Sequence, residues 1–328
     1  MAERATAGRT PDEQAAARIL TAVTGNAVVS VRRFPTGLAH YVYDARLDDG
    51  TALVVRLTRP EWSDAFAGAI YWSERLRPLG VPLPEIIYAD ASGDAHGLPV
   101  LILERLPGTD LGEVYPALSA EQKRRIAAQI VDVQRRVAML PHGPGFGYAH
   151  SYDDPTLKPS WKDELDSHLE RSRGRIRAVG IVDEAVVDRV QKTVAAHGGY
   201  FARVEPVCFL DDTTTKNVIV ADGELTGIVD VDVVCFGDPL RTPALTQMSL
   251  LNLGYDGIYI DAWLDQLALD REQRQAVTLY TAMFCGDFMS ELGQRFNQDE
   301  AAPVEPERMH RLTAILEILL PASGDRRS

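Results

Sequence analysis

The sequence predicts an α+β protein in which strands dominate the first part of the chain and helices dominate the second. Two observations support this class. Five short apolar segments rich in Val, Leu and Tyr precede residue 107, and after it apolar residues recur mainly at three- and four-residue intervals. The chain has 328 residues, enough for about two units of domain size. We therefore expect an N-terminal lobe of residues 1–106 and a C-terminal lobe of residues 107–328.

The N-terminal part is predicted to hold a five-stranded antiparallel sheet and one main helix. A short helix before the sheet is indicated by Thr10, Pro11 and Glu13, and Gly25 marks its end. The turn signal Asp48-Asp49-Gly50 joins two of the strands as a hairpin. The expected strands are residues 28–34, 40–48, 51–58, 86–90 and 99–106, and the main helix spans residues 63–79.

The C-terminal part is predicted to be mainly helical, with one small group of strands. Pro107-Gly108-Thr109 breaks the strand pattern, and the apolar period of a helix dominates from there on. Three strand-like segments, 207–211, 217–221 and 225–231, interrupt the helices and contain the densest polar cluster of the sequence. The expected helices are residues 119–140, 162–178, 183–197, 240–253, 259–268, 271–296 and 304–320.

Charge and composition exclude several classes of protein. Lys and Arg number 34 against 47 Asp and Glu, and the net charge of −13 argues against nucleic acid, whose phosphates attract basic surfaces. No apolar stretch approaches the roughly 18 residues of a membrane span, and the N-terminus has no apolar signal segment. Cys208, Cys235 and Cys285 form no disulfide or zinc pattern. We expect a cytoplasmic protein without nucleic-acid or membrane partners, whose acidic excess serves solubility or suits a cationic partner.

The polar cluster holds residues that suit phosphoryl transfer. Asp212 and Asn217 lie five residues apart between two apolar strands, and Asp230 follows thirteen residues after Asn217 at the end of another apolar segment. Transfer from ATP needs a carboxylate that takes the proton of the acceptor hydroxyl, and oxygen ligands that hold Mg²⁺ against the phosphates. These three residues can fill both roles. Each of them, taken singly, is also an ordinary turn or cap residue.

Several further segments occur in a fixed order around this cluster. They are Phe34-Pro35-Thr36-Gly37-Leu38, Leu53-Val54-Val55-Arg56-Leu57, Gly80-Val81-Pro82-Leu83-Pro84, Leu101-Ile102-Leu103-Glu104-Arg105-Leu106-Pro107-Gly108 and Gly237-Asp238-Pro239. With these segments the chain resembles the aminoglycoside phosphotransferase and choline kinase family from about residue 25 to about residue 295. The family consists of small-molecule kinases, and the resemblance implies a bilobal protein-kinase-like fold.

The resemblance implies a reaction and roles for the polar cluster. Asp212 matches the catalytic base, and Asn217 and Asp230 match the ligands of Mg²⁺. The implied reaction is phosphorylation of a hydroxyl on a small molecule, with an aminoglycoside or related amino-sugar as the first candidate acceptor. Two alternatives stay open, namely a metabolite kinase acting on choline, homoserine or a ketosamine, and a nucleotide-binding pseudokinase without transferase activity.

The resemblance also implies a nucleotide site between the two lobes. Arg56 on the third strand and the loop around Gly37 match the groups that position the phosphates of ATP or GTP. Backbone groups around Glu104 and Leu106 match the hinge that binds the adenine ring. The predicted cofactors are therefore ATP, or GTP, and Mg²⁺.

The chain departs from the family pattern at several positions. Leu210 and Asp211 stand where the family usually has His and Gly before the catalytic Asp, and Lys216 replaces a small residue before Asn217. The second carboxylate at Asp211 is expected to raise the pKa of Asp212 by like-charge repulsion. The helix glutamate that usually pairs with the third-strand base falls near Ala69, so Glu74 is the candidate if the helix is shifted or turned.

A set of acidic and aromatic residues in the helical part is a candidate acceptor site, because carboxylates and aromatic faces both attract ammonium groups. The alternative interpretation is a solvated acidic helix with Trp263 in the core. The members of the set are Tyr255, Asp256, Tyr259, Asp261, Trp263, Asp265, Asp287 and Glu291.

Overall fold

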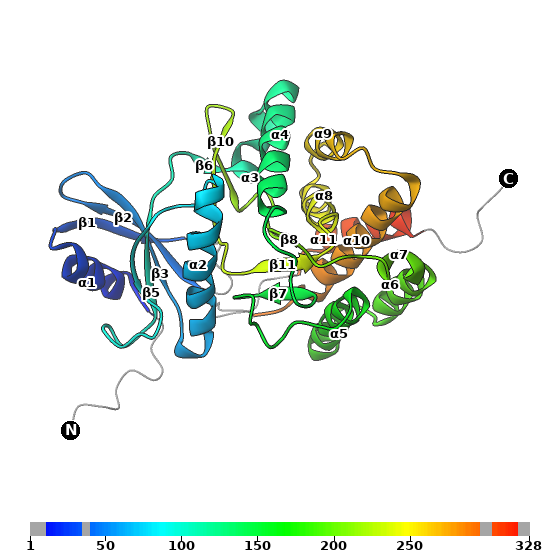
Figure 1. Ribbon diagram of the computed structural model, residues 1–328, viewed down its shortest axis with the longest axis horizontal. Coiled ribbons are helices and arrows are strands. Elements are labelled where there is room, and N and C mark those ends of the chain that lie inside the picture. The colour runs from blue at the N-terminus through cyan, green and yellow to red at the C-terminus, as the bar shows by residue number, and fades with distance from the viewer. Residues whose placement is uncertain (1–10, 35–39, 296–303, 321–328) are drawn as a thin grey trace.

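The computed structural model describes residues 11–34, 40–295 and 304–320. Its N-terminal part is built on a five-stranded antiparallel sheet, in the strand order β1-β2-β3-β5-β4. Each strand lies close to a predicted one, so the sheet predicted from the sequence is confirmed (Figure 1). The strands are β1 (Val28–Arg33), β2 (Tyr41–Leu47), β3 (Ala52–Leu57), β4 (Ile86–Asp90) and β5 (Val100–Glu104).

Two helices accompany this sheet. Helix α1 (Glu13–Thr24) begins after Asp12, whose side chain accepts a hydrogen bond from the Ala15 N–H at 2.8 Å, and it ends at Gly25. Asp12 therefore caps α1; the predicted cap, Thr10, lies outside the described residues. Helix α2 (Ser63–Leu76) connects β3 to β4 and lies on the side of the sheet that faces the helical part (Figure 1).

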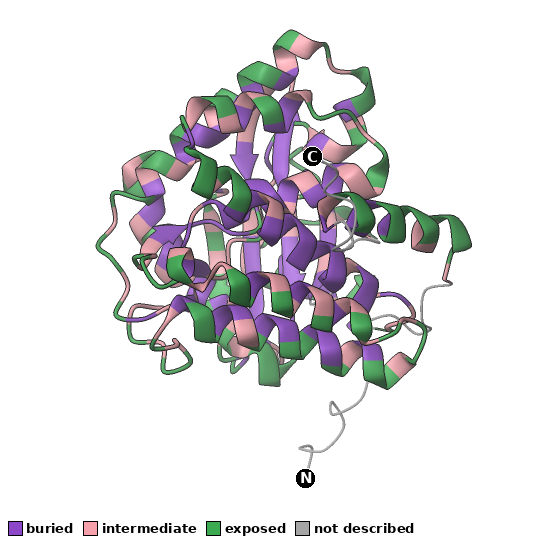
Figure 2. Cartoon of the chain, turned by 90° about the vertical axis from the view of Figure 1, so that its right-hand side faces the viewer, coloured by how far each residue is buried: buried purple, intermediate pink, exposed green. Residues whose placement is uncertain are grey.

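The C-terminal part is mainly helical, as predicted. Its helices turn their buried residues inward and leave exposed residues on their outer faces (Figure 2). Helix α10 is buried along most of its length and packs against α5, α6, α8 and α11. The helices are α3 (Leu111–Val114), α4 (Ala120–Val137), α5 (Trp161–Val179), α6 (Ala185–Ala196), α7 (Gly198–Phe201), α8 (Arg241–Leu253), α9 (Ile258–Gln266), α10 (Arg271–Ser290) and α11 (Pro306–Leu319).

Two small sheets hold the polar cluster between them. One has the order β10-β9-β6 and the other the order β7-β11-β8. The loop with Asp212 and Asn217 connects β8 to β9, and Asp230 lies between β10 and β11. Strands β7 and β11 were not expected, and the predicted strand 225–231 ends at Ile228. The strands are β6 (Thr109–Asp110), β7 (Gly147–Ala149), β8 (Val207–Phe209), β9 (Val218–Ala221), β10 (Glu224–Ile228) and β11 (Val234–Gly237).

This arrangement confirms the predicted two-lobed α+β fold. The predicted division after residue 106 falls between β5 and β6 and stays a prediction. Cys208, Cys235 and Cys285 are buried free thiols, in agreement with the absence of a disulfide pattern. Among the described residues, every helix is too short or too polar to cross a membrane.

Candidate active site

The loop from Asp212 to Asn217 is closed by the side chain of Asn217. Its Nδ2 donates to the backbone carbonyl of Asp212 at 3.0 Å, which ties the two ends of the loop together. The backbone carbonyl of Asn217 accepts from the Val229 N–H at 2.9 Å, so the loop is also joined to the residue before Asp230. The three predicted residues Asp212, Asn217 and Asp230 are therefore brought close together, by one contact within the loop and one contact across twelve residues.

Asp212 has the properties of a general base. Its side chain is accessible to solvent, and its Oδ1 accepts a hydrogen bond from Thr214 Oγ1 at 2.9 Å. Desolvation by the surrounding protein raises the pKa of Asp212 to about 6, and the negative charges of Asp230 and Asp211 add to this rise. A carboxylate with a pKa this close to neutrality can both accept and release a proton at working pH. The predicted repulsion by Asp211 thus contributes, but desolvation by the surrounding protein is the larger cause.

Asp230 adopts a strained backbone conformation. Its φ of 64° lies in the left-handed region, which residues other than glycine rarely adopt. Such conformations are concentrated at functional sites, because the surrounding structure must hold them in place. The side chain of Asp230 is 53% exposed, and Oδ1 accepts from an amino nitrogen of Arg56 at 2.8 Å. Burial of the carboxyl group raises the pKa of Asp230, and Arg56 opposes that rise.

Arg56 lies buried between two carboxylates. Its two amino nitrogens contact both oxygens of Asp232 at 2.7 Å, and one of them also contacts Asp230. The guanidinium carbon lies 5.3 Å from the centre of the Phe66 ring on α2. Burial lowers the pKa of Arg56, but the charges of Asp232 and Asp230 outweigh it and raise the pKa above its ordinary value. Arg56 is therefore a fixed positive charge directly beside the candidate metal ligand.

The helix partner proposed for Arg56 is wrong. The side chain of Glu74 is 71% exposed, and its nearest cation is the neighbouring Arg75 at 4.0 Å. Ala69, the position expected from the alignment, does line a small pocket together with Arg56 and Asp230. Helix α2 therefore has the expected phase, and no carboxylate stands at the position that faces Arg56.

The predicted hinge follows β5. The Glu104 N–H is bonded to the Glu85 carbonyl at 2.9 Å, and the Leu106 carbonyl accepts from the guanidinium of Arg105 at 3.1 Å. The groups that remain for an adenine ring are the Glu104 carbonyl and the Leu106 N–H. Gly37, predicted to contact the phosphates, lies outside the described residues.

The unusual residues before Asp212 are compensated by other contacts. Leu210 is buried, and the side-chain amide of Gln134 bonds to both its N–H and its carbonyl, at 3.1 and 2.7 Å. The carboxylate of Asp211 points into the helical part, where it accepts from the Tyr148 hydroxyl at 2.5 Å and lies 3.6 Å from Nε of Arg241. Arg241, rather than the exposed Lys216, therefore balances the charge of Asp211. These contacts brace the loop where a histidine is missing.

The candidate acceptor residues of α9 are divided between core and surface. Tyr259 and Trp263 are fully buried core residues, whereas Asp261 and Asp265 are exposed. Asp256, just before the helix, is paired with Lys123 at 2.6 Å. The structure thus favours the alternative interpretation of this stretch, a solvated helix with an aromatic core.

The acidic pair on and after α10 has a different environment. Asp287 is buried and accepts from Ser172 at 2.7 Å, with Arg171 and Arg175 at 3.5 and 3.4 Å. Glu291 is partly buried, and this burial together with the charge of Asp287 raises the pKa of Glu291. Glu291 is consequently the member of this pair that an incoming cation can still engage.

Asn217 and Asp230 fit a magnesium ion that is shared with phosphate. In the part of the chain that the structure describes, His, Cys, Asp and Glu side chains form no cluster of three or more that could complete a metal site. Mg²⁺ is commonly bound by one or two protein ligands, with substrate phosphates and waters filling the other positions. An amide oxygen and a carboxylate oxygen are suitable donors for that arrangement.

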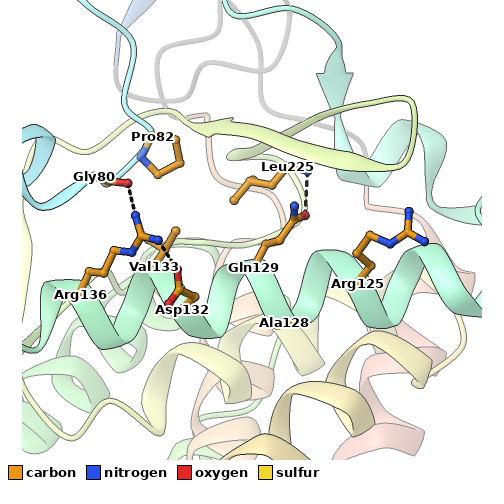
Figure 3. Close-up of a pocket in the computed structure, with 9 residues that line it drawn as sticks. All are labelled: Gly80, Pro82, Arg125, Ala128, Gln129, Asp132, Val133, Arg136 and Leu225. Carbon is orange, nitrogen blue, oxygen red and sulfur yellow. Dashed lines mark hydrogen bonds and ion pairs between the residues drawn. The ribbon is translucent and has the colours of Figure 1, made fainter.

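A wider pocket lies away from these residues, between α4, β10 and the segment before β4 (Figure 3). Arg136 spans its edge and donates to the Gly80 carbonyl at 2.9 Å, and Gln129 accepts from the Leu225 N–H at 2.9 Å. None of the nine residues that line this pocket is a predicted site residue. Its contacts join the segment before β4 to the helical part, which is a structural role.

Sequence reasoning missed two residues of the site, Asp232 and His40. Asp232 pairs with Arg56, and His40 Nε2 lies 3.0 Å from Oδ2 of Asp232. The second acid at position 232, two residues after Asp230, was visible in the sequence, but the chain there is not a regular strand, so the direction of its side chain could not be predicted. His40 carried no such signal, since it contacts a residue 192 positions away.

Comparisons with known proteins support the resemblance to a phosphotransferase family. Residues 30–276 match the model of the family described as the phosphotransferase enzyme family, which covers more than half of the chain. No curated protein matches the sequence.

Solved structures share the fold at low sequence identity. A thermostable mutant of aminoglycoside phosphotransferase APH(4)-Ia, in a ternary complex with ADP and hygromycin B, is 17% identical, with a TM-score of 0.63 and coverage of 92% of this chain and 97% of that one. A GDP complex of aminoglycoside 2'-phosphotransferase IIIa is 16% identical (TM-score 0.65; coverage 94% and 96%). A protein assigned as a fructosamine-3-kinase from Thermobifida fusca is 18% identical (TM-score 0.58; coverage 92% and 98%).

Proposed function

Because the chain belongs to the phosphotransferase enzyme family, we propose that it transfers the γ-phosphate of ATP, or GTP, to a hydroxyl group of a small molecule with the help of Mg²⁺. The observation that carries the proposal is the closure of the Asp212–Asn217 loop against the residue before Asp230. It brings Asp212, whose pKa is raised to about 6, close to the candidate ligands Asn217 and Asp230 and to the buried cation of Arg56, and so supports this proposal.

The residues divide the chemistry as follows. Asp212 orients the acceptor hydroxyl and takes its proton while the hydroxyl oxygen forms a bond to the γ-phosphorus and the bond to the leaving nucleoside diphosphate breaks. Asn217 and Asp230 hold Mg²⁺, which neutralises phosphate charge when bound. Arg56 directs its guanidinium to the phosphates, and the Glu104 carbonyl and Leu106 N–H bind the base. Positioning and charge neutralisation account for most of the rate.

An aminoglycoside or related amino-sugar is the first candidate acceptor. The net charge of −13 and the partly exposed carboxylate of Glu291 support a cationic molecule. Hygromycin B is bound by one protein of this fold.

A second candidate, a metabolite with a single amine such as a ketosamine, is favoured by the pairing of the other acids. Asp256 is neutralised by Lys123, and Asp287 by Arg171 and Arg175, so few carboxylates remain for a polycation. One protein of this fold is assigned as a fructosamine-3-kinase.

The test is phosphate transfer from radiolabelled Mg-ATP and Mg-GTP to a panel of aminoglycosides, macrolides, ketosamines, choline and homoserine. Asp212→Asn is the matched control, since it keeps the shape of the side chain and removes the base. We expect it to lower turnover by about 10²-fold or more with unchanged ATP affinity. Wild-type turnover in this variant would remove Asp212 from the reaction. ATP binding without transfer to any acceptor would instead support a pseudokinase.

A further inference from the structure

The guanidinium of Arg56 is held by two carboxylates that differ in exposure. Asp232 is 13% exposed, and its two carboxylate oxygens make a bidentate contact with the two amino nitrogens of Arg56. Asp230 is 53% exposed and contacts only one of these nitrogens. A bidentate contact between arginine and carboxylate fixes the orientation of the guanidinium as well as its distance from the carboxylate. Asp232 therefore sets the orientation of Arg56, whereas the contact with Asp230 can be exchanged for another ligand.

Helix α2 comes too close to Asp232 to supply a carboxylate of its own. A Cβ atom placed on Gly68 would lie 2.2 Å from the backbone oxygen of Asp232, so the helix and this segment are in direct backbone contact. The next residue, Ala69, has only a methyl group to offer to the pocket beside Arg56. The two acidic residues of α2, Asp64 and Glu74, are exposed. Close backbone packing at Gly68, rather than an ion pair between side chains, thus connects α2 to the segment that carries Asp232.

Asp232 is itself held in place by His40. The two ring nitrogens of His40 lie 3.0 Å from Oδ2 of Asp232 and 3.0 Å from Oγ1 of Thr58. His40 and Thr58 are both buried, and they lie directly before β2 and directly after β3, respectively. Burial tends to raise the pKa of Asp232, but Arg56 and His40 lower it far below its ordinary value, so the carboxylate stays charged.

We propose that Asp232, braced by His40, is the positioning residue that keeps Arg56 directed at the nucleotide phosphates, in place of a carboxylate from α2. This inference rests on the proposed function. When Asp230 engages Mg²⁺, Arg56 loses one partner and keeps the other. The N–H group released from Asp230 is then free to donate to a phosphate oxygen, while Asp232 prevents the guanidinium from following Asp230.

The test compares Asp232→Asn with Glu74→Gln, which removes the exposed acid of α2. In Asp232→Asn the guanidinium has only the Asp230 carboxylate left, so it competes with Mg²⁺. We expect KM for ATP and the Mg²⁺ concentration for half-maximal rate each to rise about tenfold or more, with a smaller change in kcat. Calorimetric titration of the protein with ATP, with and without Mg²⁺, should show the same loss of affinity. Glu74→Gln should match the wild type in every measurement.

A second variant separates positioning from folding. His40→Gln retains an N–H donor toward Asp232, whereas His40→Leu does not, so affinity for Mg-ATP should fall in the leucine variant and recover largely in the glutamine variant. Unchanged Mg²⁺ dependence and ATP affinity in folded Asp232→Asn would overturn this inference while leaving the proposed function intact. A rise in KM for ATP and in the Mg²⁺ requirement of Glu74→Gln, without such a rise in Asp232→Asn, would also overturn it. Absence of phosphate transfer in the wild type would count against the proposed function, and calorimetry would still test Asp232.

Discussion

Two arginines, Arg56 and Arg241, are buried beside aspartates of the candidate active site, yet their surroundings differ. Arg56 has a partner, Asp230, that reaches solvent. Arg241 is enclosed with Asp211 and Glu164, both buried, and its nearest carboxylate oxygens lie at 3.6 Å. The first group is open to an incoming ligand and the second is closed. The two groups show that an ion cluster with one solvent-exposed carboxylate can exchange that partner for a ligand. A cluster whose members are all buried instead holds a loop in place.

The closed group of Arg241, Asp211 and Glu164 stabilises the loop that carries Asp212. The hydroxyl of Tyr148 donates to Asp211 and accepts from Arg241 at 2.9 Å, and Nδ1 of His168 also lies 2.9 Å from Arg241. Asp211 and Asp212 are neighbours in the chain, so the contact that turns Asp211 inward leaves the carboxylate of Asp212 at the accessible surface. A second acid beside Asp212 is therefore compatible with the proposed role of Asp212 as the base, because only the carboxylate of Asp212 reaches the accessible surface.

The largest expected effect is loss of stability on replacing the enclosed arginine. Arg241→Met leaves Asp211 and Glu164 buried without a cation, and breaking a buried pair in this way costs about 3–5 kcal/mol. Arg56→Met should cost only about 1–3 kcal/mol, because Asp232 keeps His40 as a partner and Asp230 reaches water. Urea denaturation measures both values. Equal losses of unfolding free energy in the two variants would contradict the distinction between the open and closed groups.

The next effect concerns the exposed member of the open group. Asp230→Ala removes a charged ligand, and we expect Mg-ATP binding to weaken about tenfold or more, because a charge-assisted contact is worth at least about 1.4 kcal/mol. Asp211→Asn is the control from the closed group, and it should reduce stability and leave Mg-ATP binding unchanged. Calorimetric titration measures the affinity of both variants for Mg-ATP. An Asp230→Ala variant that binds Mg-ATP like the wild type would exclude this residue from the metal site.

The contrast between local and distant contacts also explains what the sequence could predict. The five strands and α2 were predictable because hairpin turns, glycine stops and apolar periods are local features. Asp212, Asn217 and Asp230 were found through their spacing. By contrast, Arg56 and Asp232 are 176 residues apart, and no pattern in either segment indicates that they meet.

One further prediction was wrong and two strands were missed, in each case for a physical reason. Glu74 was proposed because the family resemblance implies a helix glutamate that pairs with Arg56, but which face of α2 meets the segment with Asp232 is set by packing, here by the close approach at Gly68. Strands β7 and β11 have three and four residues, and β11 is buried on both faces, so neither shows the alternation that identifies a longer strand.

The pH dependence of turnover should distinguish the two aspartates at 211 and 212. A base must be deprotonated, so activity is retained above the pKa of Asp212, about 6, and falls about tenfold for each pH unit below it. Removal of the buried charge in Asp211→Asn should move the midpoint of this acidic limb to lower pH, because that charge helps to raise the pKa of Asp212. A limb centred near pH 4 in the wild type would contradict the role of burial.

The smallest expected effect comes from Thr214, whose hydroxyl donates to Oδ1 of Asp212 at 2.9 Å. A hydrogen bond to the charged form lowers the pKa of a carboxyl group, so Thr214→Val, which has the same shape without the donor, should raise the pKa of Asp212. One such bond contributes about 0.5–1.5 kcal/mol, so we expect the acidic limb to move upward by about half a unit to one unit. Thr214→Ser keeps the hydroxyl and should leave the limb in place. An unchanged limb in Thr214→Val would mean that desolvation and the neighbouring charges set the pKa of Asp212 without a contribution from the Thr214 hydroxyl.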